Sequence, residues 1–164
     1  MDPFSVTTII DVPREQVFAY LRDIANHAEF TDHYLVDWHM LREDTAGAGA
    51  GARFRMKAPL TRFDWADMTF ADVEPNHRIV ERGRGGKANR IRTLGVWELT
   101  DGPEDATRVR FTIETRPVMA SDRLLEGLVV SRWLRRQTRR AVHRLRSILE
   151  EGTRRGKRAT IAAR

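Results

Sequence analysis

The sequence contains no cysteine among its 164 residues. Disulfide bonds, thiolate metal sites and cysteine nucleophiles are therefore excluded. The sequence also lacks any apolar run of the roughly 18 residues that a membrane-spanning helix needs. Its first residues do not show the basic-then-apolar pattern of a secretory signal. We therefore expect a cytoplasmic protein.

Sequence patterns for metal, phosphate or serine-hydrolase chemistry are missing as well. Neither His-Glu-x-x-His nor Gly-x-Ser-x-Gly occurs, and the glycine-rich stretch 47–51 is not followed by Gly-Lys-Ser/Thr. His27, His33 and His39 are spaced by six residues, which suits neither one helical face nor one strand face. Asp23 and His27 are four apart on an expected helix and are predicted simply to pair. We expect no metal and no cofactor.

Acidic residues are scarce near the C-terminus. From Ser121 onward there are 13 Lys and Arg against 4 Asp and Glu, a surplus of nine positive charges in a chain whose net charge is +6. The preceding residues therefore carry a net charge of −3. A solvated helix face is the favoured interpretation, and docking on an anionic membrane or nucleic acid is the alternative. Trp133 is the single aromatic residue beside these arginines, which argues against RNA stacking.

The strongest positive signal is a long amphipathic helix over residues 121–151. Its apolar face is predicted to contain Val130, Leu134, Ala141, Leu145, Ile148 and Leu149. Its opposite face and flank are predicted to contain Arg132, Arg135, Arg136, Arg139, Arg140, Arg144 and Arg146. Small residues also fall on the apolar face, namely Gly127, Ser131 and Thr138. They leave room either for close approach of another element or for a cavity, and both interpretations stay open.

The first turns of this helix are apolar nearly all round. The residues responsible are Leu124, Leu125, Leu128 and Val129. A single sheet covers only one face of a helix, so these side chains are predicted to close a cavity mouth or to meet a second subunit. A homodimer is therefore possible.

Everything before this helix is predicted to consist mainly of strands. Residues 4–12 alternate as a half-buried strand, after which Pro13 precedes a short helix at 14–23 and a helical piece at 26–30. The remaining strands are predicted at 34–42, 53–58, 63–73, 78–82, 91–99 and 109–115. The apolar phase slips near Ala71 and Asp72, which predicts a β-bulge.

This order predicts an α+β fold in which a seven-stranded curved antiparallel sheet (β-α-α-β6-α) wraps around the long C-terminal helix. Residues 1–152 are predicted to form one ligand-binding domain, and residues 153–164 a basic flexible tail. A wide sheet twists and curls, and one helix of about 10 Å diameter cannot fill the resulting trough. A cavity is therefore expected between the sheet and the helix.

Three segments resemble the helix-grip fold of the START-like superfamily, which includes polyketide cyclases and dehydrases and lipid-transport proteins. They are Ile10-Asp11-Val12-Pro13-Arg14-Glu15-Gln16-Val17-Phe18-Ala19-Tyr20-Leu21 with Asp23, Trp97-Glu98-Leu99 with Thr107-Arg108-Val109, and Leu145-Arg146-Ser147-Ile148-Leu149-Glu150. The resemblance covers residues 4–151 and implies binding of hydrophobic or aromatic small molecules. It also implies catalysis in only some members.

Strand phase selects the residues expected at the ligand. We predict that Phe54, Met56, Met68, Phe70, Trp97, Phe111, Leu134 and Thr138 bind it. The phase also places Val6, Thr8, Ile10, Leu99 and Ile113 along the same wall.

Few polar residues are candidates for chemistry. Tyr34 is a candidate for a cavity hydroxyl, by analogy with the tyrosine of related cyclases. Glu81 follows the inward phase of its strand, and a buried carboxylate there would have a raised pKa and could act as a proton donor or base. The favoured expectation places it in water at the strand end. Arg53 and Arg55 are expected to point outward, whereas a register shifted by one residue would bring them into the cavity as oxyanion-binding cations. The remaining carboxylates of interest, Asp64 and Asp67, are expected on opposite sides of one strand, so at most one of them faces inward.

Two classes of function remain. The first is binding of a hydrophobic or aromatic small molecule, with a polyketide cyclase or dehydrase activity as a subsidiary hypothesis. The second is a non-enzymatic lipid carrier, or a module that docks on an anionic membrane or RNA through its arginines.

Overall fold

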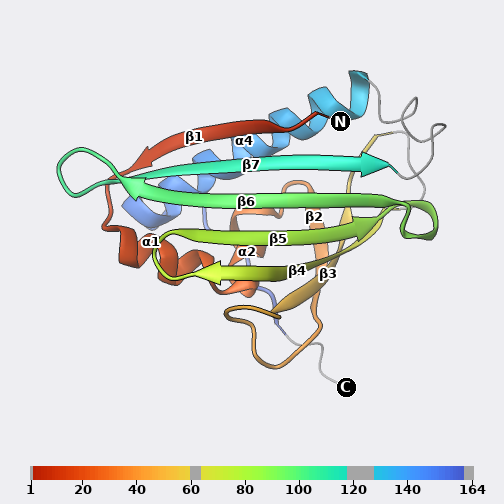
Figure 1. The fold of residues 1–164 in the computed structure, drawn as a ribbon, viewed down its shortest axis with the longest axis horizontal. Coiled ribbons are helices and arrows are strands. Elements are labelled where there is room, and N and C mark those ends of the chain that lie inside the picture. Colours follow the sequence, from red (N-terminus) through yellow and green to blue (C-terminus); the bar gives the residue numbers. More distant parts are fainter. Residues whose placement is uncertain (1, 60–63, 118–127, 161–164) are drawn as a thin grey trace.

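The computed structural model describes residues 2–59, 64–117 and 128–160 (Figure 1). Within them the strands are β1 (Phe4–Ile10), β2 (Leu35–Met40), β3 (Gly51–Met56), β4 (Trp65–Glu74), β5 (Arg78–Gly85), β6 (Ile91–Asp101) and β7 (Thr107–Pro117). The helices are α1 (Arg14–Leu21), α2 (His27–Thr31) and α4 (Leu128–Glu151), with short 3₁₀ turns η1 (Ile24–Asn26) and η2 (Lys87–Asn89).

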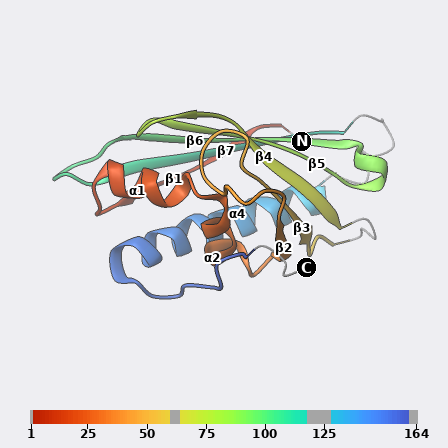
Figure 2. The same cartoon turned by 90° about the horizontal axis from the view of Figure 1, so that it is seen from below.

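The strands form one antiparallel sheet in the order β1-β7-β6-β5-β4-β3-β2. The chain therefore meanders from β2 to β7, and β1 joins the free edge of β7. Figure 2 shows α1, α2 and α4 together on one face of the sheet. The predicted fold class, a curved antiparallel sheet around a long C-terminal helix, is confirmed.

Two bulges adjust which side chains face the helix. The predicted bulge in β4 is confirmed, because its register against β5 shifts between Phe70 and Asp72. A second bulge, not predicted, shifts β2 against β3 between Val36 and His39, where Asp37 adopts a φ of 53°. It lets Leu35 and Trp38, three residues apart, both line the space under the sheet.

Helix α4 presents the predicted faces. Leu134, Ala141, Leu145 and Ile148 are buried, whereas the arginines of the opposite face are exposed. Arg144 is the exception, because its guanidinium turns inward to the carboxylate of Asp32. The helix thus closes the sheet with an apolar stripe and leaves its basic side to solvent.

The predicted first turns of the helix, including Leu124, Leu125 and Gly127, lie outside the described residues. Val129 is 56% exposed at the start of the described helix. The homodimer stays a prediction that light scattering can test.

Residues 153–160 run back along the other helices. The amides of Gly156 and Ala159 donate to the carbonyl oxygens of Glu29 and Ala25 at 2.9 and 3.0 Å, and Ala159 is buried. Arg158 pairs with the carboxylate of Asp23 at 2.5 Å. The division of the chain at residue 152 stays a prediction, and the described part of the expected tail has specific contacts with the domain.

Candidate ligand-binding site

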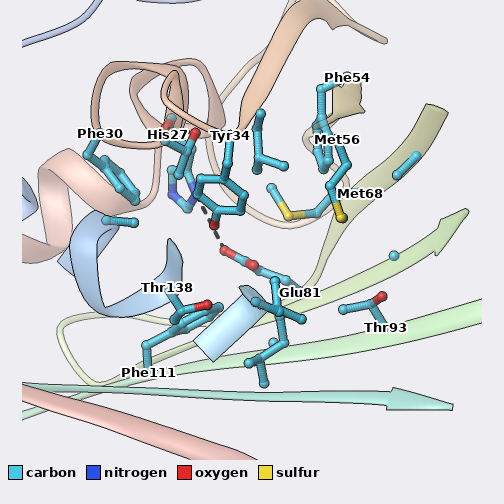
Figure 3. Close-up of a pocket in the computed structure, with 18 of the residues that line it drawn as sticks. His27, Phe30, Tyr34, Phe54, Met56, Met68, Glu81, Thr93, Phe111 and Thr138 are labelled. Carbon is cyan, nitrogen blue, oxygen red and sulfur yellow. Dashed lines mark hydrogen bonds and ion pairs between the residues drawn. The ribbon is translucent and has the colours of Figure 1, made fainter. Parts of the chain in front are cut away.

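A cavity of about 90 Å³ lies between the sheet and α4. Figure 3 shows side chains entering it from α2, from the strands and from α4. Its lining is mostly aromatic and aliphatic: Phe30, Tyr34, Leu35, Trp38, Phe54, Met56, Ala66, Met68, Trp97, Phe111, Ile113, Leu134, Ala141 and Val142. The buried polar residues of the lining are His27, Thr31, Glu81 and Thr138, and buried Tyr34 adds a phenol hydroxyl.

Small residues in the sheet create the space. Gly83 pairs with Met68 on one side and Thr93 on the other, and both of these neighbours line the cavity. Gly95 also lines it, and a Cβ atom there would lie 2.8 Å from Oε2 of Glu81 and 3.1 Å from the Phe111 ring. Glycine at position 95 is therefore required by the close approach of the Glu81 carboxyl group.

Most residues predicted to bind the ligand do line this cavity. They are Phe54, Met56, Met68, Trp97, Phe111, Leu134 and Thr138. Trp97 stacks on Phe111 with 4.1 Å between ring centroids. Their role in binding stays a prediction.

Phe70 is outside this lining, although its strand phase matches that of Met68. It is 1% exposed, and its ring centroid lies 5.4 Å from that of His27. It therefore supports the floor beneath His27. Phase alone assigns the face of a strand but does not say how far along that face the cavity extends.

Glu81 lies inside the protein, so the favoured expectation that it sits in water at the strand end was wrong. Only 6% of the residue is exposed, and burial raises the pKa of its carboxyl group to about 7. The indole Nε1–H of Trp97 donates to Oε1 at 2.6 Å, which opposes that rise in pKa. At neutral pH this carboxyl group is poised to gain or lose a proton.

His27 is the partner that sequence reasoning missed. Its Nδ1 lies 3.4 Å from Oε1 of Glu81, and its Nε2 lies 2.8 Å from the carbonyl oxygen of Leu21. A carbonyl oxygen can only accept, so Nε2 carries a proton. Burial lowers the pKa of the imidazole to about 4, which leaves Nδ1 unprotonated at neutral pH. The protonated Glu81 carboxyl therefore supplies the hydrogen between the two groups, and Figure 3 marks this contact.

No local pattern links His27 to a residue on β5, since the two are far apart in sequence. The expected pairing of Asp23 with His27 is not found. Asp23 instead caps η1 by accepting from the Ala25 amide at 3.1 Å, and it pairs with Arg158. The misinterpretation arose because helical spacing was assumed to continue through Asp23, whose backbone is extended.

The hydroxyl groups of Tyr34 and Thr138 also lie on the lining of this cavity. Tyr34 is 7% exposed, and burial together with the nearby Glu81 charge raises the pKa of its phenol. Thr138 is 1% exposed, and its Oγ1 has no hydrogen-bond partner among the described residues. Of the two interpretations of the small residues on α4, the position of Thr138 fits the cavity.

The outward-facing arginines were predicted correctly. Arg53 pairs with Asp67 and Arg55 with Asp64, each at 2.6 Å, and both arginines are exposed. The expectation that Asp64 and Asp67 lie on opposite sides was wrong, because both meet arginines of β3. Asp64 precedes β4 and so does not follow the alternation of that strand.

The described part of the chain contains neither a cluster of metal ligands nor a membrane-spanning helix. In residues 2–59, 64–117 and 128–160, no group of three His, Asp or Glu side chains is placed to hold a metal ion. Within the same ranges, no helix has the length and apolar character that crossing a bilayer requires.

Solved structures share this architecture. The chain matches the KanY protein with a TM-score of 0.73 and 17% identity, covering 91% of this chain and 97% of that one. It matches a Thermus thermophilus protein with a TM-score of 0.68 and 14% identity over 93% and 99% of the two chains. It matches Ara h 8.0201 with a TM-score of 0.64 and 7% identity, covering 90% of this chain and 97% of that one. These similarities establish a Bet v 1-like helix-grip fold.

Among curated proteins, none matches the sequence significantly. A family model described as polyketide cyclase/dehydrase and lipid transport matches residues 1–150. The match spans the sheet and nearly all of α4, the elements that enclose the cavity. The family match and the fold together support the binding of a hydrophobic ligand. The chain belongs to the polyketide cyclase/dehydrase and lipid transport family.

Proposed function

We propose that this protein binds an apolar or aromatic small molecule in the cavity between the sheet and α4. The observation that carries the proposal is a lining of aromatic rings and methionines around a few convergent polar groups. Trp97, stacked on Phe111, offers a ring face to such a ligand. The family and the fold support the same class of ligand.

The size of the cavity limits how binding occurs. Its volume of about 90 Å³ is below the roughly 300–1,000 Å³ of common ligand pockets. An apolar cavity that binds one benzene ring has a volume of about 150 Å³. Met56 and Met68 are half-buried at the lining, and unbranched methionine side chains repack at low cost. Ligand entry is therefore expected to displace these two side chains.

Filling the cavity should abolish binding. Thr93 lines the cavity, whereas Leu94 is the next residue of β6 and is 37% exposed. The Thr93→Phe variant should bind acetophenone at least tenfold more weakly, because the added ring occupies the ligand space. Leu94→Phe puts the same side chain on the outer face and should bind as the wild type does. Quenching of tryptophan fluorescence measures the affinity of both variants for acetophenone. Equal affinity of Thr93→Phe and wild type would contradict the proposal.

A cyclase or dehydrase activity is the finer form of this proposal. Glu81, with its pKa of about 7, has the proton affinity expected of a general acid or base, and Tyr34 lies in the same cavity. A flexible substrate held against Trp97 would be folded into a reactive conformation before proton transfer. Exchanging Glu81 for glutamine keeps the size of the side chain and removes the transferable proton, so turnover would be lost while binding remained.

Docking on an anionic membrane is a second candidate function. It is favoured by the exposed arginines of α4, of which Arg132, Arg136 and Arg139 have no carboxylate partner among the described residues. Between Leu128 and Arg146 the helix contains no acidic residue at all. A nucleic acid is less well matched, because Trp133 is half-buried against Tyr34 and does not offer a free ring for stacking.

Charge removal on this face should weaken binding to vesicles that contain phosphatidylglycerol. Replacing Arg132, Arg136 and Arg139 by glutamine should reduce vesicle affinity at least tenfold, since each arginine near the surface contributes about 1 kcal/mol. The exposed arginines on the outer face of the sheet, Arg82, Arg108 and Arg110, provide a control with the same net charge. Cosedimentation at rising salt measures the effect. Equal loss in both triple variants, or salt-independent binding, would rule out this surface.

A further inference from the structure

We infer that the ligand is uncharged and carries an oxygen acceptor, such as a ketone carbonyl, that receives a hydrogen bond from the Thr138 hydroxyl. The inference rests on the proposed binding function and names the chemical class of its ligand. The observation behind it is that a hydroxyl group on the cavity wall is buried and has no partner among the described residues.

The Thr138 hydroxyl is unusual for its place in a helix. A threonine inside a helix commonly bonds to the carbonyl oxygen four residues earlier, and here Oγ1 makes no such bond. A buried polar group without a partner destabilises the fold, so each one needs an explanation. A partner supplied by the ligand explains why a hydroxyl occupies a position between Leu134 and Ala141 on the apolar stripe.

The buried polar groups on the α2 and β5 side of the cavity are engaged with one another or with the backbone. Oε1 of Glu81 interacts with both Trp97 and His27, and the imidazole of His27 is used on both sides. The Thr31 hydroxyl donates to the carbonyl oxygen of His27 at 2.6 Å. The Thr138 hydroxyl is therefore available to a ligand atom on the α4 side of the cavity, and the Tyr34 hydroxyl is a second donor on the lining (Figure 3).

The charges around the cavity argue for an uncharged ligand. Arg84 and Asp67 are the lining residues with permanent charges, and they pair with each other at 3.6 Å, with the Arg84 side chain 66% exposed. No lysine or arginine in the described residues places a buried charge in the cavity. An anionic ligand would therefore lose its hydration without gaining a cation. A cationic ligand would have to compete with the His27 and Trp97 contacts of Glu81.

The test compares acetophenone with ethylbenzene, which has nearly the same shape and lacks the carbonyl oxygen. In Thr138→Val, which preserves side-chain shape, acetophenone should lose about tenfold in affinity, the size of one hydrogen bond, and ethylbenzene should lose nothing. Thr138→Ser keeps the hydroxyl and should retain the preference for acetophenone. The thermal midpoint of Thr138→Val should equal or exceed that of the wild type, because the unpaired hydroxyl is gone.

Each result is decisive. If both probes bind and Thr138→Val leaves their affinity ratio unchanged, the role of Thr138 is wrong while the proposed function stands. If benzoate or benzylamine binds as tightly as acetophenone, the assignment of an uncharged ligand is wrong. If none of the four probes binds the wild type, the proposed function fails, and the inference fails with it.

Discussion

Replacing Glu81 by glutamine should make the protein more stable relative to the wild type as the pH rises from about 4.5 to about 7. Both contacts of Glu81 use Oε1, and the amide oxygen of glutamine keeps one of them by accepting from the indole N–H of Trp97. Glutamine carries no proton that the fold can hold or release. The variant therefore isolates the free energy associated with one buried proton.

The sign follows from the raised pKa of Glu81, which is about 7 in the folded protein and 4.5 in the unfolded chain. Below pH 4.5 both states are protonated, and the wild type bears no penalty. Between the two values the unfolded chain releases its proton while the folded protein keeps it, so wild-type stability falls as the pH rises. The full difference amounts to roughly 3 kcal/mol, and above pH 7 it stays constant.

In the wild type, the titration of His27 offsets the pH dependence of stability that Glu81 causes. Its pKa is lowered to about 4 in the fold from 6.5, so its contribution to stability is complete above pH 6.5 and is lost as the pH falls towards 4. Over most of the interval from pH 4.5 to 6.5 the two slopes oppose each other. The unfolding free energy of the wild type should therefore change little with pH in this interval. The His27 contribution is common to both proteins, so it cancels in the difference between the unfolding free energies of Glu81→Gln and wild type. The groups facing the pair, Tyr34 and Trp97, stay uncharged across this range.

Urea unfolding at several pH values, followed by tryptophan fluorescence, measures the difference in unfolding free energy. Glu98→Gln makes the same chemical change at an exposed position of β6 and should show no comparable pH dependence. A constant difference between Glu81→Gln and wild type from pH 4.5 to 7 would show that Glu81 is ionised and solvated in the fold.

The fold was accessible from the sequence because its main determinants are periodic. The stripe of Leu134, Ala141 and Leu145 specifies a helix face, and the phase slip beside Ala71 locates a bulge. The second bulge, at Asp37, leaves no such trace, since a left-handed aspartate within a short strand looks like an ordinary polar position. Leu35 and Trp38 were therefore not expected in the cavity wall.

The polar part of the site was harder to predict because its partners are distant in sequence. The inward phase of Glu81 was recognised, but its burial depends on His27 from α2, on Trp97 from β6 and on the missing side chain at Gly95. A lone carboxylate at an inward-facing strand position is more often solvated than buried, so Glu81 was predicted to lie in water. The contacts of residues 153–160 were missed for a similar reason, since glycine and basic residues usually indicate a free terminus.

Replacing Arg144 by methionine should destabilise the protein by roughly 2–4 kcal/mol, because several charge-assisted hydrogen bonds are lost at once. The Arg144 side chain is 15% exposed and contacts the Asp32 carboxylate. Its Nη2 also donates to the carbonyl oxygens of Glu29 and Arg154 at 3.0 and 2.9 Å. One guanidinium thus joins α4, α2 and the residues that follow α4.

The effect should extend to the cavity. Helix α2 carries His27 and Phe30 into the cavity wall, and the amide of Gly156 bonds to the same Glu29 carbonyl that Arg144 contacts. In Arg144→Met, the amides of Gly156 and Ala159 should exchange with solvent faster than in the wild type. Affinity for acetophenone should fall as well, because α2 is less firmly held against the sheet.

Arg140→Met is the matched control, since Arg140 is one turn earlier on α4 and exposed. Its unfolding free energy should stay within about 0.5 kcal/mol of the wild type. Urea unfolding and amide hydrogen exchange measure both variants. Equal effects at the two positions would mean that the Arg144 contacts add nothing beyond surface charge. Residues 153–160 would then act as the free tail that their composition suggests, and α2 would be held in place by its apolar contacts alone.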